Sequence, residues 1–192
     1  MPVEIEVKMR LDAPDALEAE LRSLGATCRG SVLEQNTYYD TPAADLRRGG
    51  QGLRLRIEQS IDGDQRQVIV THKGPRAPGS VKSRQETQVH LCDAGNGREL
   101  LEALGYRPVL SFEKRRRRWQ LDDCSVEIDT LPYLGNFAEI EGPDEPTILA
   151  VRRRIGMDEV PLIQKSYLGL LREHLKTHGI SEAHVTFESA EG

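Results

Sequence analysis

The residues with the clearest chemical potential lie in the segment VEIEVKMRL, residues 3–11. If this segment is extended, its side chains alternate between two faces, so that Glu4, Glu6, Lys8 and Arg10 share one face. Neighbouring carboxylates repel one another unless a cation balances them, and Mg²⁺ or Mn²⁺ prefers such oxygen ligands. Neighbouring bases need an anion. The segment therefore predicts a site for a cation and an anion together.

Charged side chains recur at every second residue in five further segments. These are GLRLRIE with Arg54, Arg56 and Glu58; SRQETQVH with Arg84 and Glu86; FEKRRRRW with Lys114, Arg116 and Arg118; VEIDTL with Glu127 and Asp129; and NFAEIEG with Glu139 and Glu141. For any single segment, the solvated face of an open sheet explains the pattern. Solvated faces usually mix in Ser, Thr, Asn and Gln, however, and these faces are nearly all acid or base. A closed barrel of about eight strands would turn them inward around one small ligand.

An oxygen-rich anion bound together with a divalent metal ion fits such an interior. Arginine and lysine hold phosphate oxygens by charge-assisted hydrogen bonds, while the metal bridges them. The sequence therefore predicts a polyphosphate site, in which Glu4 and Glu6 bind metal and Lys8 binds phosphate.

The elements that must position these residues are marked by capping and turn residues. Helices are predicted at 12–25, 96–106, 144–156 and 165–179. Strands are predicted at 3–11, 31–39, 52–59, 66–73, 83–91, 110–121, 124–131 and 137–141, with Asp122 and Asp123 in a hairpin turn. This order indicates an α+β fold: a closed antiparallel β-barrel that forms a tunnel, with peripheral helices and a C-terminal helical segment. We expect one tunnel domain over residues 1–178 and a loose tail over residues 179–192.

The composition limits the class of protein. The chain has 192 residues, 38% of them hydrophobic and 30% charged, with a net charge of -5, which is typical of a soluble globular protein and argues against bulk nucleic-acid binding. The basic run at 114–118 is predicted to lie in a strand, so its side chains point to both faces. No signal peptide and no span of about 20 apolar residues is visible. Cys28, Cys92 and Cys124 form no CxxC pair. We expect a cytoplasmic monomer or homodimer without a nucleic-acid or membrane partner.

The chain resembles the CYTH superfamily, also called triphosphate tunnel metalloenzymes and named for class IV adenylyl cyclases and thiamine triphosphatases. The ExExK signature of that family matches Glu4, Glu6 and Lys8. Further motifs follow in the family's order: NTYYDTP, LRLR, THKGP, RQE, EKRR, EIDTLPYLGNFAEIE and KSYLGLL. The resemblance covers residues 3 to about 172. It implies a barrel tunnel with divalent metal ions on an acidic side and a triphosphate on a basic side.

The resemblance also implies roles for individual residues. The metal-binding set is Glu4, Glu6, Glu86, Asp129, Glu139 and Glu141. The triphosphate-binding set is Lys8, Arg54, Arg56, Lys73, Arg84, Lys114 and Arg116. The residues implied for catalysis are Glu6, Lys8, Arg56 and Lys73. Where some relatives carry one more carboxylate, this chain has Gln88, which leaves one metal ligand fewer.

The activity that the resemblance favours is that of a class IV adenylyl cyclase, which converts ATP to cyclic AMP and pyrophosphate with Mg²⁺ or Mn²⁺. The compact length and the GNFAEIE and KSYLGLL motifs carry this preference. Hydrolysis of inorganic triphosphate or thiamine triphosphate fits the same residues. A polyphosphate- or nucleotide-binding module without catalysis is a further alternative, although simple anion binding needs no acidic metal-binding set.

Overall fold

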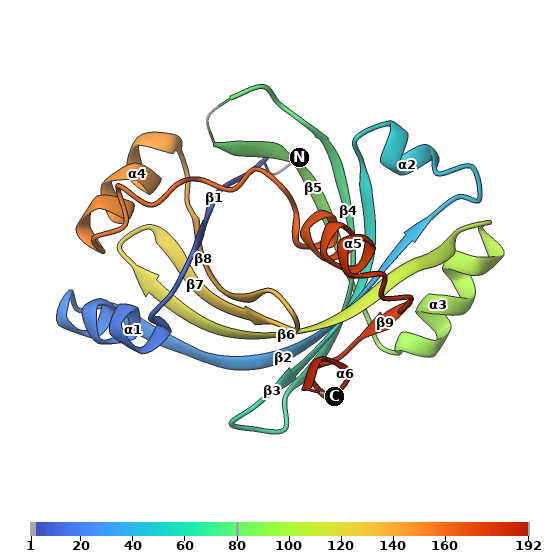
Figure 1. Cartoon of the computed structure of the whole chain (residues 1–192), viewed down its shortest axis with the longest axis horizontal. Coiled ribbons are helices and arrows are strands. Elements are labelled where there is room, and N and C mark those ends of the chain that lie inside the picture. The colour runs from blue at the N-terminus through green and yellow to red at the C-terminus, as the bar shows by residue number, and fades with distance from the viewer. Residues whose placement is uncertain (1–2, 80, 192) are drawn as a thin grey trace.

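The computed structural model describes residues 3–79 and 81–191, which form one large sheet of strands with short helices around it (Figure 1). The strands are β1 Val3–Arg10, β2 Thr27–Asp40, β3 Gly52–Ser60, β4 Arg66–Arg76, β5 Lys82–Leu91, β6 Arg107–Leu121, β7 Cys124–Leu131, β8 Gly135–Glu141 and β9 His184–Val185. The helices are α1 Pro14–Ser23, α2 Asp45–Arg48, α3 Ala94–Ala103, α4 Glu145–Arg154, α5 Tyr167–His178 and α6 Phe187–Glu191.

Strands β1 to β8 form a closed antiparallel barrel. They pair in the order β2-β3-β4-β5-β1-β8-β7-β6, and β6 pairs with β2 to complete the ring. The short strand β9 adds to β6 in parallel. This arrangement confirms the predicted α+β fold with a closed barrel and peripheral helices. The hairpin at Asp122 is also confirmed, since Leu121 pairs with Cys124 and Asp122 has a left-handed backbone at φ 51°.

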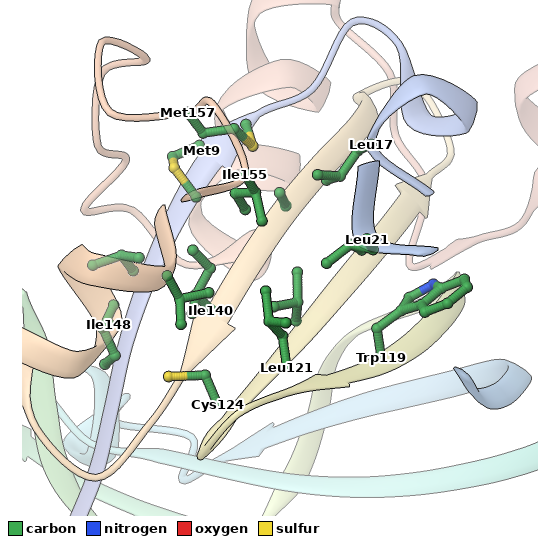
Figure 2. Close-up of a cluster of buried hydrophobic side chains, with 14 of the residues drawn as sticks. Met9, Leu17, Leu21, Trp119, Leu121, Cys124, Ile140, Ile148, Ile155 and Met157 are labelled. Atoms are coloured by element: carbon green, nitrogen blue, oxygen red, sulfur yellow. The ribbon is translucent and has the colours of Figure 1, made fainter. Parts of the chain in front are cut away.

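Apolar residues lie on the outside of the barrel, where helices cover them. One cluster packs α1 and α4 against the outer faces of β1, β6, β7 and β8, with Leu21, Trp119, Ile140 and Ile148 at its centre (Figure 2). A second cluster places α3 against β3 and β4. The hydrophobic effect therefore holds the helices on the outer surface, which leaves the inner faces to the charged residues.

Helix α5 closes one end of the barrel. Here the inward-facing residues of β6, β7 and β8 change from charged to apolar, and Phe112, Leu131 and Phe137 pack with Tyr167 and Leu171 of α5. Ser166 caps the helix, since its Oγ accepts a hydrogen bond from the backbone N–H of Gly169 at 3.2 Å. The cap fixes where the helix begins and so directs Tyr167 toward the barrel.

The structure differs from the sequence prediction mainly after Gly179 and near Asp45. The segment expected to be a loose tail contains β9 and α6, and Val185 is completely buried beside β6. This part of the chain is therefore packed. Helix α2 falls between two predicted strands, where we predicted no helix. Asp40 accepts hydrogen bonds from the backbone N–H groups of Leu46 and Arg47 at 2.9 and 3.1 Å. Among the described residues, no helix is both long and apolar enough to cross a membrane.

Candidate functional site

The interior of the barrel holds a cavity of about 370 Å³ with charged walls. It is lined by Glu4, Glu6, Lys8, Tyr38, Arg54, Arg56, Glu58, Gln67, Ile69, Lys73, Arg84, Glu86, Gln88, His90, Lys114, Arg116, Arg118, Glu127, Glu139, Glu141, Ser166 and Tyr167. Every residue that we predicted for metal or triphosphate binding lines this cavity, apart from Asp129. The period-two pattern brought them together because the barrel strands turn the faces that carry these charges inward.

One wall of the cavity is basic and is braced by a buried carboxylate. Glu34 of β2 is fully buried between β3 and β6, and its oxygens lie 3.0 Å from Arg56 Nη1 and 3.1 Å from Lys114 Nζ. Burial alone would raise the pKa of this carboxyl, but the surrounding Arg56, Lys114 and Arg116 hold it well below its usual range. Glu34 therefore stays ionised and balances the charge of the basic wall.

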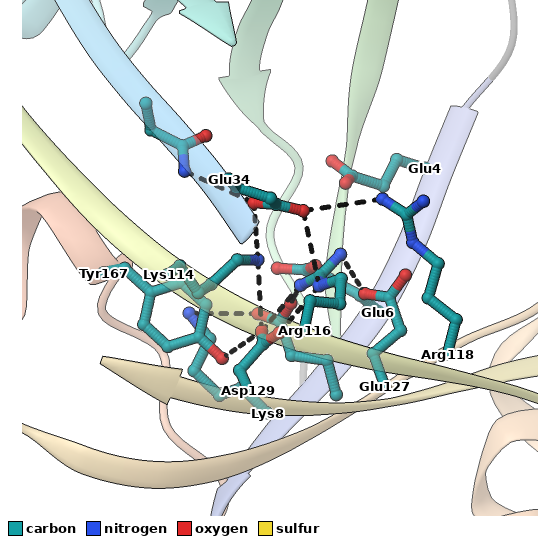
Figure 3. Close-up of polar contacts among 12 residues, drawn as sticks. Glu4, Glu6, Lys8, Glu34, Lys114, Arg116, Arg118, Glu127, Asp129 and Tyr167 are labelled. Atoms are coloured by element: carbon teal, nitrogen blue, oxygen red, sulfur yellow. Dashed lines mark hydrogen bonds and ion pairs between the residues drawn. The ribbon is translucent and has the colours of Figure 1, made fainter. Parts of the chain in front are cut away.

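Asp129 has a similar supporting position on β7. It has no exposed surface, and Arg116 donates to both of its oxygens, from Nε and Nη2, at 2.6 Å each. Lys114 Nζ lies 3.3 Å away, and the hydroxyl of Tyr167 donates to Oδ2 at 2.8 Å (Figure 3). Donors of the chain itself thus occupy the oxygens of Asp129, which lies behind the cavity wall.

The opposite wall is acidic and comes from β1, β7 and β8. Glu6 pairs in register with Glu141, and Glu139 pairs with Glu127 on the next strand. Burial comes first in raising the pKa of Glu127 to about 7, against the effect of Arg116. Glu141 lies at the exposed edge of this wall, where partial desolvation and the nearby Glu4 raise its pKa to about 7 as well. Both shifts reflect carboxylates crowded together in a partly dry site.

Lysines contact the acids of the cavity, among them Lys73 from β4 and Lys8 from β1 itself. Lys73 Nζ lies 2.6 Å from both Glu4 Oε1 and Glu86 Oε2. Although burial opposes it, this contact helps to hold the pKa of Glu86 down at about 2. Lys8 Nζ lies 3.1 Å from Glu139 Oε1. Acids and bases therefore meet inside the cavity, which makes both kinds of group available to one ligand.

Arg54 differs from the other bases of the cavity. It is only 8% exposed, yet within residues 3–79 and 81–191 no carboxylate lies within ion-pair distance of it. Its Nη2 makes a long hydrogen bond of 3.4 Å to Thr71 Oγ1, and its Nε has no partner there. A buried guanidinium without a counter-charge is costly. An anion bound beside Arg54 would therefore supply the missing counter-charge.

A second cavity of about 320 Å³ adjoins the first at Arg54. The two share Tyr38, Arg54, Lys73, Arg84 and Ser166. Beyond these shared residues, the second cavity is lined by Gly50, Gln51, Gly52, Arg76 and Leu168. It is therefore less charged than the barrel interior and lies next to the helix that closes this end.

The prediction from sequence missed Glu34, Glu58, Arg118 and Glu127 as site residues. The period-two pattern did place Glu58, Arg118 and Glu127 on inward faces, but the predicted metal- and triphosphate-binding sets left them out. Glu34 is followed at the next two alternate positions by the uncharged Asn36 and Tyr38, so no charge repeated every second residue marks it. Tyr38 was also missed; burial favours its neutral form, but Arg54 and Lys73 lower the pKa of its hydroxyl overall.

The acidic wall fits a hard divalent cation. Glu127, Asp129 and Glu139 each place one carboxylate oxygen within 4.8 Å of the others. Glu4, Glu6 and Glu141 line the same cavity, and carboxylate oxygens are the ligands that Mg²⁺ and Mn²⁺ prefer. The donor set is therefore compatible with the metal that the sequence predicted.

Comparisons with known proteins agree with the geometry. Adenylate cyclase CyaB of Aeromonas hydrophila is 32% identical over 182 residues, covering 90% of each chain. Human thiamine-triphosphatase is 26% identical over 163 residues, covering 71% of this chain and 67% of its own. The structure of the PH1819 protein of Pyrococcus horikoshii superposes with a TM-score of 0.77 at 26% identity, over 89% of this chain and 99% of its own. The model of the CYTH domain matches residues 2–167, and the chain therefore belongs to the CYTH domain family.

Proposed function

We propose that this chain is a divalent-metal-dependent enzyme that acts on triphosphate compounds, and that it converts ATP to cyclic AMP and pyrophosphate. The observation that carries the proposal is Arg54, a buried cation without a carboxylate partner among the described residues, across the cavity from crowded carboxylates. An anion alone would compensate the charge of Arg54, and a cation alone would compensate the charge of the carboxylates. A triphosphate bound together with a metal ion would compensate both.

In this proposal Glu4, Glu6, Glu86, Glu139 and Glu141 hold the metal, as the sequence predicted, and Glu127 joins them. When bound, the metal would supply positive charge that neutralises the phosphates. Asp129, whose oxygens already accept hydrogen bonds from Arg116 and Tyr167, orients the basic wall instead. Lys8, Arg54, Arg56, Lys73, Arg84, Lys114 and Arg116 hold the triphosphate.

The role of these bases is to fix the triphosphate in line for attack. Arg54 and Lys73 lie where the charged cavity meets the second cavity. A phosphate at that junction would have its organic group in the less charged space beside Leu168. For ATP this places the α-phosphorus near the junction and the pyrophosphate among Lys8, Lys114 and Arg116. The ribose 3′ oxygen forms the new bond to the α-phosphorus and releases its proton to water, while the bond from the α-phosphorus to the β-phosphate oxygen breaks and its electron pair leaves with pyrophosphate.

The second cavity favours a substrate with an organic group over inorganic triphosphate, which would leave that space unused. The similarity to adenylate cyclase CyaB, at 32% identity over 90% of both chains, supports the cyclase reaction. Hydrolysis of thiamine triphosphate is the second candidate, and the similarity to human thiamine-triphosphatase supports it. In that reaction water attacks the terminal phosphorus.

Phosphorus NMR separates these reactions by their products. The protein is incubated with ATP, thiamine triphosphate or inorganic triphosphate, each with Mg²⁺, with Mn²⁺ or with a chelator. We expect ATP to give cyclic AMP and pyrophosphate without free phosphate, and only with metal present. Release of phosphate from thiamine triphosphate without formation of cyclic AMP from ATP would contradict the cyclase reaction and support the hydrolase reaction. Tight binding of all three compounds without turnover would indicate a binding module.

A further inference from the structure

Tyr167 reaches the charged cavity from outside the set of barrel strands. It is the first residue of α5 and follows the capping Ser166, more than 20 residues after the last barrel strand ends at Glu141. It nevertheless lines the cavity and is only 8% exposed. The closing helix thus inserts one aromatic side chain among the charged residues of the barrel.

The two parts of this side chain make different contacts. The hydroxyl donates to Asp129 Oδ2 at 2.8 Å, and Asp129 in turn accepts from Arg116 at 2.6 Å (Figure 3). The ring lies beneath Lys8, whose Nζ is 3.4 Å from the ring centroid. Phe137 packs edge-on against the same ring, with the centroids 5.2 Å apart. The ring therefore cannot turn without disturbing both contacts.

The ring contact matters because Lys8 has few other fixed partners. Its Nζ lies 3.1 Å from Glu139, and its hydrogen bond to the backbone oxygen of Lys165 is long, at 3.5 Å. An aromatic face attracts an ammonium group and favours one position over many. Lysine otherwise has a flexible stem with considerable rotamer entropy. The ring thus limits where the ammonium group can be.

We propose that Tyr167 is a positioning residue: its ring fixes Lys8, and its hydroxyl, through Asp129, fixes Arg116, so that both cations are oriented before the triphosphate binds. This inference rests on the proposed function, because it assigns a purpose to two members of the triphosphate-binding set. It also connects α5, which lies outside the barrel sheet, to the geometry of the reaction.

The competing explanation is that Tyr167 is only a core residue of the cluster that holds α5. That explanation predicts that truncation lowers stability without a specific effect on triphosphate binding. The experiment must therefore measure affinity and stability separately. Isothermal titration with inorganic triphosphate and Mg²⁺ gives the affinity, and thermal unfolding gives the stability.

Three variants separate the ring, the hydroxyl and general packing. Tyr167→Leu removes the ring face, and we expect the Kd for triphosphate to rise about tenfold. Tyr167→Phe keeps the ring, so its affinity for triphosphate should be close to that of wild type. It removes the hydroxyl that orients Arg116 through Asp129, so kcat for ATP should fall by a larger factor than KM rises. Tyr133→Phe is the matched control; it removes a hydroxyl that donates to Ser189 O at 2.8 Å outside the barrel, and both Kd and kcat should remain unchanged.

A fluorinated phenylalanine series at position 167 covers the case in which Tyr167→Leu does not fold. Added fluorines weaken the negative ring face with little change in shape, so the Kd for triphosphate should rise stepwise with their number. A flat series, or a Tyr167→Leu protein that melts lower but binds triphosphate as tightly as the wild type, overturns the positioning role. Failure of the wild-type protein to bind triphosphate would instead overturn the proposed function.

Discussion

Glu34 and Glu141 are both carboxylates of the barrel, but their surroundings are opposite. Glu34 has no exposed surface and lies within 4 Å of Arg56, Lys114, Arg116 and Arg118. Glu141, at the other side of the cavity, makes no ion pair with any residue of the described ranges, and its nearest charges include Glu4, Glu127 and Glu6. The pKa of Glu34 is well below its usual range, whereas that of Glu141 is raised to about 7.

This difference divides the acids of the barrel into two sets. Glu34 and Asp129 are supporting acids, because they are fully buried behind the cavity lining and accept contacts only from groups of the chain. Glu4, Glu6, Glu86, Glu127, Glu139 and Glu141 are cavity acids, because they line the space where a ligand would bind. Alternation along a strand cannot separate the two sets, since it reports only which face a residue is on. Their neighbours on other strands decide what each acid can do.

The strongest test of the division is Glu34→Gln. The change leaves Arg56, Lys114 and Arg116 with less counter-charge in a buried site, and we expect the free energy of unfolding to fall by about 3–5 kcal/mol. Urea unfolding at pH 7 measures it. Glu141→Gln is the control at a cavity acid and should not destabilise the protein. Equal losses in the two variants would contradict the division.

The difference in stability between wild type and Glu34→Gln should depend on pH in a defined direction. A carboxyl with a depressed folded-state pKa stabilises the fold above its unfolded pKa of about 4.3 and loses that contribution as the pH falls through the folded value. The gap in stability between wild type and Glu34→Gln should therefore be constant from pH 8 to about pH 5 and close only in stronger acid.

The bases can be divided in the same way, with Arg54 and Arg56 as the contrast. Arg54→Met should weaken triphosphate binding about 10- to 100-fold, the loss of one or two charge-assisted hydrogen bonds, without lowering stability. Arg56→Met should also lower stability, because Arg56 balances Glu34 at 3.0 Å and Glu58 at 3.1 Å. Titration calorimetry and urea unfolding of both variants test this. A loss of stability in Arg54→Met would mean that its charge is compensated within the fold.

Glu6→Gln tests whether a cavity acid binds metal. Loss of a residue that only orients a metal ligand already costs about 10- to 100-fold in metal affinity, and we expect at least that loss for Mn²⁺. Electron paramagnetic resonance of Mn²⁺ titrations measures the affinity without any turnover. Asp129→Asn is the contrast at a supporting acid. This variant should have a lower free energy of unfolding than wild type, while its Mn²⁺ affinity stays close to that of wild type. Unchanged Mn²⁺ affinity in Glu6→Gln would remove the opening strand from the metal site.

The smallest expected effect is that of Glu141→Gln on stability without divalent metal. A carboxyl with a raised folded-state pKa destabilises the fold fully above about pH 7, and the penalty disappears as the pH falls toward the unfolded value. The variant should therefore melt about 1–2 °C above wild type at pH 8 and no higher at pH 4, because solvent screens this exposed carboxylate. Added Mn²⁺ should reverse the order at pH 8. A constant difference at all pH values would contradict the shift.

Much of this architecture could be predicted from the sequence because strand alternation is a local property. The charges of Arg54, Arg56, Lys114 and Arg116 repeat every second residue, which placed them on inward faces. Glu34 could not be found this way, since its partners come from β3 and β6 and its alternate neighbours on β2, Val32 and Asn36, carry no charge. The choice between Glu127 and Asp129 likewise depends on Tyr167, which enters from a distant helix.

The tail and the short helix α2 escaped prediction for a related reason. Two residues of β9 pair with β6, and this pairing depends on tertiary contacts rather than on local propensity. Helix α2 is four residues long and is held by Asp40, whose carboxylate accepts backbone N–H groups of the first turn. Both are too short to leave a periodic pattern.

The pairing of β2 with β6 also governs how the chain reaches its native state. The register joins Thr27 to Gln120 and Asp40 to Arg107, so the ring cannot form until segments far apart in sequence have met. Such non-local pairings slow folding, to milliseconds or longer in domains rich in β-structure. Until then the inner faces remain in water, and because they carry charges, an open intermediate exposes little apolar strand surface on that side. The groups that prepare the interior for an ionic ligand should therefore also protect the half-formed barrel from aggregation.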